Sequence, residues 1–234
     1  MFTVAIKVWG DFACFTRSES KINRVSYDVP TPSACRGVLE AIYCKPLEFW
    51  YEITKIKVLN PIRQIGVLKN EITKKTDPNP KTMKPIVINN DTRTQRYTYY
   101  LRDVAYIIEA NVHVRESYRP DIPMYEKERK INTEFEKRVR KGKCFSQPYF
   151  GLKECMCFFE EPDGDEKPID ETRHLGVMLY DIFDPSSQEP LNTSRKKKEN
   201  NVARVVKPSY FVSEMINGVV DVPLYNSDEV VKPV

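Results

Sequence analysis

The sequence predicts an α+β fold, and three observations carry this prediction. Residues 2–9 place alternate side chains on two faces, which is typical of a half-buried strand. Residues 32–44 and 124–141 repeat apolar side chains every fourth position, which is the spacing of one helix face. The order of the predicted segments up to residue 159 is β-α-β-β-α-β, the order of a ferredoxin-like domain.

Local signals support the first three elements. In the strand over 2–9, apolar side chains occupy every second position on one face. The helix over 32–44 begins after Thr31, which can cap it, and proline follows at its first position. Residues 48–59 are rich in aromatic and β-branched types and predict a second strand. The alternation slips near Lys55, which indicates a β-bulge.

The middle of the chain is less regular. Residues 69–96 are polar and interrupted by proline, which predicts a long basic loop that can contain a short hairpin. Residues 97–114 predict a long strand. A helix then follows over 124–141 and stops at Gly142, and residues 149–159 predict a further strand.

The C-terminal part predicts a small antiparallel three-stranded β extension. It begins with a strand over 174–183, which is followed by a polar, Lys-rich loop over 184–208. A hairpin follows, with Asn217-Gly218 as its turn signal. Three such strands are rarely stable alone, so we expect them to pack on the first domain. The predicted domain boundaries are 1–160 and 173–234.

Composition excludes several classes of protein. The chain has 234 residues, of which 41% are hydrophobic and 30% charged, as in globular rather than disordered proteins. No apolar stretch approaches the ~20 residues of a membrane span, and no signal peptide is recognised, so we expect a cytoplasmic protein. None of the six cysteines lies in a Cys-x-x-Cys pair. We therefore expect no metal site and no cofactor.

The charges are unevenly distributed. Residues 124–143 hold eight Lys or Arg against four Glu, and residues 195–207 hold six against one. Residues 160–172 hold seven acids against one Lys. Two basic stretches with aromatic residues nearby indicate a partner with a phosphate backbone, although solvated faces are the alternative. No phosphate-binding loop, dinucleotide fingerprint or nucleophile elbow occurs in the sequence, so an RNA partner is the favoured hypothesis.

A family resemblance supports this hypothesis. The chain resembles the CRISPR-associated Cas-five family, in its subtype I-C form, in five stretches that follow the family's order: "FTRSESKINRVSYDVPTPSACRGVLEAIYCKP", "VLNPIR", "LRDVAYIIEA", "KGKCFSQPYFGLKE" and "LGVMLYDI…FVSEMINGVVDVP". The resemblance implies a RAMP-type protein with one RRM-like domain. It also implies a metal-independent endoribonuclease that cleaves precursor CRISPR RNA beside the repeat hairpin and leaves a 2′,3′-cyclic phosphate. Such a protein stays on the 5′ handle within the Cascade complex, beside the repeated backbone subunit and the large subunit.

The resemblance also implies a catalytic pair, Tyr43 and Lys130. The family has a histidine after the lysine, and Ile131 stands there in this chain. The alternative is therefore a structural subunit that caps the 5′ handle without cutting. His113 and His174 are candidate substitutes for the missing histidine, or solvated strand residues. A histidine at position 131 is expected to raise the cleavage rate, and less so if that position faces the core.

Further residues are predicted to bind the RNA. They are Arg24, Arg36, Lys45, Arg129, Lys137, Arg138, Arg140, Lys141, Lys143, Phe145 and Tyr149. Each has a structural alternative. Tyr43 can cover the core, and Lys130 can form helix ion pairs with glutamates four residues away. Phe145 and Tyr149 can stack on bases or pack under the last strand. The loops over 69–96 and 184–208 are expected to order against RNA or neighbouring subunits, so deleting 192–201 should weaken binding or assembly.

Overall fold

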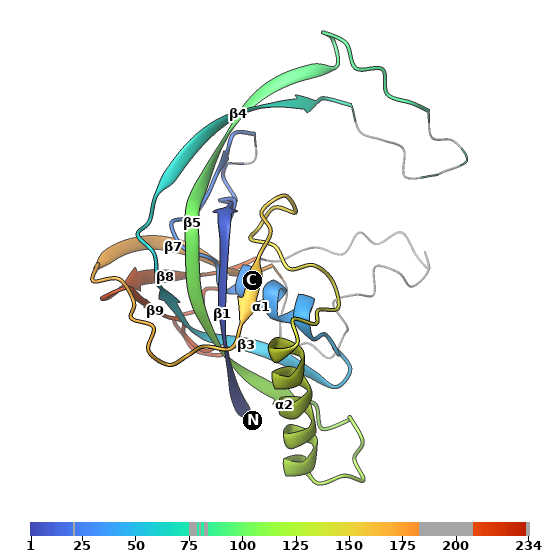
Figure 1. Cartoon of the computed structure of the whole chain (residues 1–234), viewed down its shortest axis with the longest axis vertical. Coiled ribbons are helices and arrows are strands. Elements are labelled where there is room, and N and C mark those ends of the chain that lie inside the picture. The colour runs from blue at the N-terminus through green and yellow to red at the C-terminus, as the bar shows by residue number, and fades with distance from the viewer. Residues whose placement is uncertain (21, 75–78, 80, 82–83, 183–207, 233–234) are drawn as a thin grey trace.

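The computed structural model describes residues 1–20, 22–74, 79, 81, 84–182 and 208–232. The predicted α+β class is confirmed, because the described residues form a mostly antiparallel sheet and few helices (Figure 1). The loop over 184–208 and its deletion at 192–201 fall almost wholly outside the described residues. The elements are β1 (Phe2–Ala13), β2 (Arg24–Val25), α1 (Pro32–Ile42), β3 (Phe49–Val58), β4 (Gln64–Ile72), β5 (Arg93–Val114), α2 (Met124–Arg140), β6 (Phe158–Glu160), β7 (Arg173–Asp181), β8 (Ser209–Met215) and β9 (Val219–Asp221).

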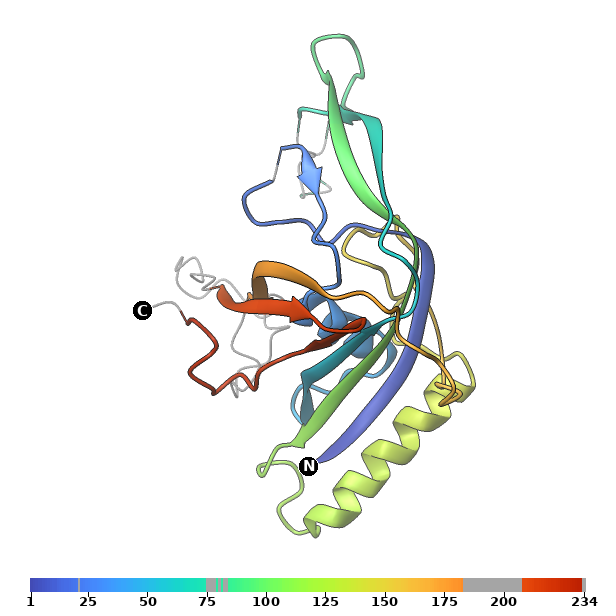
Figure 2. The same ribbon diagram turned by 90° about the vertical axis from the view of Figure 1, so that its left-hand side faces the viewer.

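The main sheet has the strand order β6-β1-β5-β3-β9, and each neighbouring pair on this path is antiparallel. Strand β5 is the longest and lies between β1 and β3. The first half of β5 pairs with β4 rather than with β1 and β3. Strand β2 forms a short parallel pair with the same half of β5. The paired β4 and β5 extend away from the body of the molecule as a long arm (Figures 1 and 2).

Both helices cover the same face of this sheet. Phe49 and Tyr51 point to one face of β3, where Phe49 meets the Tyr43 ring and Tyr51 meets Phe135 of α2. The apolar stripe of each helix is buried there, as its four-residue spacing predicts. Thr31 caps α1 as expected, since its Oγ1 accepts a hydrogen bond from the Ala34 N–H at 3.2 Å.

Two predicted segments need correction. Residues 69–96 are not one long loop, because β4 runs to Ile72 and β5 begins at Arg93, and the two strands pair as a hairpin. The strand predicted over 149–159 is confined to Phe158–Glu160. Its first part turns back on itself because Gly151 has a φ of +78°. A Cβ there would lie 2.0 Å from the Cys14 carbonyl oxygen, so the close approach requires glycine.

The predicted three-stranded extension is wrong in one respect. Strands β7 and β8 form a separate two-stranded sheet, whereas β9 joins the free edge of β3 in the main sheet. The predicted turn at Asn217-Gly218 is confirmed, with φ values of +49° and +73°. Helix α1 packs against β3 of the main sheet and against β7 of the two-stranded sheet. The predicted β-bulge is confirmed by a register shift between Ile53 and Lys55.

None of the helices in the described residues is both long and apolar enough to span a membrane.

Candidate active site

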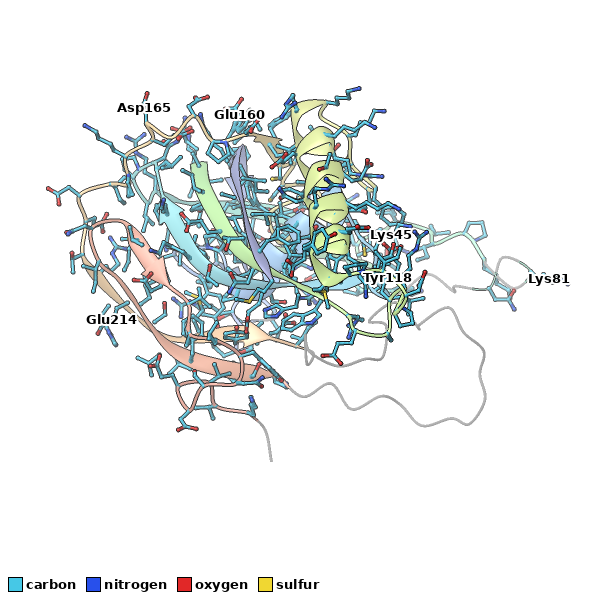
Figure 3. All side chains as sticks on the ribbon, turned by 90° about the horizontal axis from the view of Figure 1, so that it is seen from below. Lys45, Lys81, Tyr118, Glu160, Asp165 and Glu214 are labelled. Carbon is cyan, nitrogen blue, oxygen red and sulfur yellow. The ribbon has the colours of Figure 1, made fainter. Side chains whose placement is uncertain are left out.

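A cleft of about 830 Å³ lies between the end of α1, the turn before α2 and the outer side of α2. It contains both members of the predicted catalytic pair, Tyr43 and Lys130. Four of the predicted RNA-binding residues also line it: Lys45, Arg129, Lys137 and Arg138. Figure 3 shows Lys45 and Tyr118 beside α2, whereas Glu160 and Asp165 of the acidic stretch lie apart from them. The cleft is therefore rich in cations and separated from that stretch.

Tyr43 is held at the C-terminal end of α1. Its side chain is 8% exposed, and its ring lies 5.1 Å from the Phe49 ring, centroid to centroid. Burial raises the pKa of Tyr43 to about 12; Glu48 and Glu134 add to this shift and Arg138 opposes it. The phenol therefore stays protonated at neutral pH. It can donate a proton or a hydrogen bond, but it is a poor base.

Arg138 positions Tyr43 from the neighbouring helix. Its guanidinium carbon lies 4.8 Å from the centre of the Tyr43 ring. The same guanidinium donates to the Ile42 carbonyl oxygen at 3.2 Å and to Glu134 Oε1 at 2.9 Å. The bond to Ile42 joins the last turn of α1 to α2, whereas the bond to Glu134 lies within α2. Arg138 thus holds the two walls of the cleft together as well as adding positive charge to it.

Lys130 is exposed on α2 and is not held by a neighbouring acid. Among the described residues, no carboxylate lies within 4.0 Å of its ammonium, so the predicted pairs with Glu126 and Glu134 are not formed. Glu134 pairs with Lys137 and Arg138 instead. The charge of Lys130 is therefore available to a phosphate in the cleft.

Sequence reasoning missed Lys127, which also lines the cleft. It is 5% exposed and continues the buried stripe of α2 that contains Ile131, Phe135 and Val139. No acidic side chain in the described part of the chain forms an ion pair with it. A lysine four residues before an apolar stripe was the available signal, because its stem can pack while its ammonium reaches the surface.

The turn before α2 adds two more residues that sequence reasoning missed. Tyr118 and Arg119 line the cleft, and the Arg119 guanidinium carbon lies 5.7 Å from the centre of the Tyr118 ring. Burial and a hydrogen bond with Glu48 raise the pKa of Tyr118. The sequence indicated only a turn here, so neither residue was distinguishable from ordinary loop surface.

Ile131 faces the core rather than the cleft, since it is 2% exposed. We therefore expect a histidine there to give a smaller gain in cleavage rate and to lower the stability of the fold.

Ile131→His should lower the free energy of unfolding by about 2–3 kcal/mol, because it buries an imidazole without a partner. Thr133→His is the matched control: residue 133 is exposed in the cleft wall, so its cost should stay within about 0.5 kcal/mol. Urea unfolding of the three proteins measures both values. Unchanged stability together with faster cleavage in Ile131→His would show that position 131 reaches the cleft.

Arg36 is not an RNA contact in this structure, which corrects its prediction. Its Nε donates to Asp181 Oδ2 at 2.7 Å, its Nη2 to Asp181 Oδ1 at 3.0 Å, and its Nη1 to Glu40 at 2.6 Å. The side chains of Arg36 and Asp181 are both buried. Arg36 therefore joins α1 to β7 instead of meeting solvent.

The other predicted RNA contacts lie outside the cleft. Arg24 pairs with Glu71 at 3.0 Å beside the β4–β5 arm, and Arg140 pairs with Glu161 at 3.7 Å. Lys141 and Lys143 are exposed after α2. Phe145 and Tyr149 are 72% and 41% exposed, so the alternative that they pack under the last strand is wrong.

Neither histidine is brought to the cleft. His113 stacks on Trp50 with ring centroids 4.1 Å apart, and its Nε2 lies 2.7 Å from Glu52 Oε2. That hydrogen bond and a backbone N–H oppose the effect of burial and lower the pKa of Glu52. His174 lies 3.1 Å from Glu214 on the small sheet. Over the described ranges, no three His, Cys, Asp or Glu side chains are grouped as a metal site would require.

Comparison with known proteins identifies relatives along nearly the whole chain. The family model described as CRISPR-associated protein (Cas_Cas5) matches residues 3–223. A curated protein of Thermus thermophilus named CRISPR pre-crRNA endoribonuclease Cas5d is 37% identical over 224 residues, covering 95% of this chain and 92% of that protein. A protein of the same name from Mannheimia succiniciproducens is 38% identical over 242 residues, covering 97% of each.

Two solved structures share the fold. One is described as a CRISPR-associated protein; its TM-score is 0.63 at 23% identity, and the match covers 98% of this chain and 96% of that chain. The other is a functionally uncharacterized protein from Streptococcus mutans, with a TM-score of 0.63 at 22% identity and the same coverage.

Proposed function

Because this chain belongs to the CRISPR-associated Cas5 family, we propose that it binds CRISPR repeat RNA and cleaves the precursor beside the repeat hairpin without a metal ion. It then stays on the 5′ handle, next to other Cascade subunits. The observation that carries this proposal is that Tyr43 and Lys130 line one cation-rich cleft. Both relatives of 37–38% identity are named as pre-crRNA endoribonucleases.

The ferredoxin-like topology is part of the same proposal. The strand order β6-β1-β5-β3, with α1 between β1 and β3 in the chain and α2 between β5 and β6, supports a split βαβ arrangement. We assign this unit to residues 1–160 and the extension to 173–234.

The proposed reaction uses the RNA's own 2′-hydroxyl as nucleophile. Its oxygen attacks the adjacent phosphorus, the bond to the 5′ oxygen breaks, and a 2′,3′-cyclic phosphate and a 5′-hydroxyl result. Tyr43 donates its phenolic proton to the leaving oxygen, since its raised pKa keeps that proton in place until then. Lys130 and Lys127 stabilise the charge on the phosphorane. Glu126 is the candidate acceptor for the 2′-hydroxyl proton, because Glu134 is paired with Arg138.

A second candidate function is that of a structural subunit that caps the 5′ handle without cutting. The buried Ile131 favours it, because the position of the family's histidine carries no group that can transfer a proton.

One assay separates the two candidates. Repeat RNA incubated with the pure protein in excess EDTA should be cut, and the products should end in a 2′,3′-cyclic phosphate and a 5′-hydroxyl. Cleavage that appears only after a divalent metal is added would overturn the metal-free mechanism. Tight binding without cleavage under any of these conditions would establish the structural role instead.

Lys127→Met should slow single-turnover cleavage by about 100-fold, since removing one group that stabilises transition-state charge typically costs that much. Methionine keeps the buried stem, so the affinity for repeat RNA and the unfolding transition should change little. Lys153→Met, which removes an exposed lysine outside the cleft, is the matched control. Equal rates for both variants would show that Lys127 only packs.

A further inference from the structure

A second hollow, of about 620 Å³, lies along α1. Its helical wall includes the small residues Ala34, Gly37 and Ala41. Phe145 and Tyr149, from the segment after α2, also line it. Two large aromatic side chains that remain 72% and 41% exposed beside an open hollow are available to a ligand.

Hydrogen bonds hold Phe145 at this place. The backbone N–H groups of Phe145 and Ser146 both donate to the Ala41 carbonyl oxygen, at 2.7 and 3.0 Å. On the other side of the same helical turn, Arg138 donates to the Ile42 carbonyl oxygen at 3.2 Å. The last turn of α1 is therefore hydrogen-bonded both to α2 and to the segment that follows α2. Phe145 is therefore positioned by a rigid element although its side chain is exposed.

The hollow and the cleft are neighbours. Cys44 lines the hollow, whereas Tyr43 and Lys45, the residues on either side of it, line the cleft. Consecutive residues of the segment that follows α1 therefore line the two sites. We therefore expect an RNA strand that passes Tyr43 to continue toward the hollow.

The chemistry of the hollow suits an unpaired nucleobase. Aromatic side chains give stacking surfaces that accept any base, and single-stranded RNA is commonly recognised in this way. The hydroxyl groups of Ser33 and Ser146 line the hollow and can form hydrogen bonds with a base edge. The carboxylate of Glu40 also lines it, but its charge is compensated by Arg36 at 2.6 Å. Repulsion of the RNA backbone is thereby reduced.

We propose that this hollow binds one unpaired nucleobase of the repeat RNA, stacked on Phe145 and Tyr149, next to the phosphate in the cleft. This inference rests on the proposed function, because it requires the RNA to enter the cleft. The bound base fixes the position of the RNA strand relative to Tyr43. The cut is thus made beside the nucleotide whose base can unstack from its RNA neighbours and enter the hollow.

The test uses repeat RNA that carries 2-aminopurine at single positions on either side of the cut, with a 2′-deoxy sugar that blocks cleavage. Stacking on an aromatic ring quenches this fluorescent base. We expect quenching at one position with the wild-type protein, and recovery of fluorescence with Phe145→Leu or Tyr149→Leu. Each variant should bind the RNA about 5- to 100-fold more weakly. Phe158→Leu removes a 45% exposed ring that lines neither site, and is the matched control.

The possible outcomes distinguish a failure of the nucleobase site from a failure of the proposed function, the binding and cleavage of repeat RNA. RNA that binds and is cut, with fluorescence that Phe145→Leu does not change at any position, overturns the nucleobase site alone. Absence of any binding to repeat RNA overturns the proposed function together with the site. Variants that bind RNA normally but fail to join the other subunits would show that the hollow docks a protein, which also overturns the inference. Circular dichroism of each variant checks that the fold is kept.

Discussion

Tyr43→Phe should abolish most cleavage of repeat RNA, with a loss of about 10²- to 10⁴-fold in single-turnover rate. The substitution removes one hydroxyl and keeps the ring, so its packing on Phe49 and beneath Arg138 is retained. The affinity for repeat RNA should therefore stay nearly unchanged. Gel-based cleavage at saturating protein, together with a filter-binding titration, measures the two quantities separately.

The pH dependence adds a second check on the role of Tyr43. Because burial raises its pKa to about 12, the phenol is protonated on both sides of neutral pH. The wild-type rate should then show no loss from Tyr43 ionisation as pH rises through its ordinary value of about 10. Tyr97→Phe, at an exposed tyrosine of β5 outside the cleft, is the matched control. Fast cleavage by Tyr43→Phe would place the site elsewhere.

Asp181→Ala should lower the free energy of unfolding by about 3–5 kcal/mol, since it leaves the buried Arg36 without its main partner. The two side chains are 8% and 3% exposed, so water cannot replace the lost carboxylate. Asp181 also accepts hydrogen bonds from Ser33 and the Ile182 N–H, which the variant removes as well. Urea denaturation gives the stability directly.

Two further variants test the cause of that loss. Glu40→Gln alters the more exposed partner of Arg36, so its cost should be nearer 1 kcal/mol. The double variant Arg36→Met/Asp181→Leu replaces the pair by apolar groups and should recover much of the stability lost in Asp181→Ala. A cost below about 1 kcal/mol for Asp181→Ala would mean that the pair behaves as a surface ion pair.

The candidate site was predictable in part. The resemblance pointed to Tyr43 and Lys130, and the structure brings both to one cleft. Sequence reasoning also proposed Arg36 for RNA binding because it lies in one of the stretches that carry the family resemblance. Its partner Asp181 is 145 residues away, so no local pattern could reveal the pair. Lys127 was overlooked for the same reason, since its burial depends on what packs over the start of α2.

The sequence by itself determined the α+β class, the approximate positions of α1, α2, β1, β3 and β5, and the turn at Asn217-Gly218. These features depend on side-chain periodicity, helix caps and backbone preferences within a few residues. Only the tertiary structure decided that β9 pairs with β3, that Ile131 faces the core and that Phe145 stays exposed beside a hollow. Such features depend on strand edges and helix faces that meet only after distant segments have packed. The free energy that selects them comes from long-range burial and pairing, which local sequence does not encode.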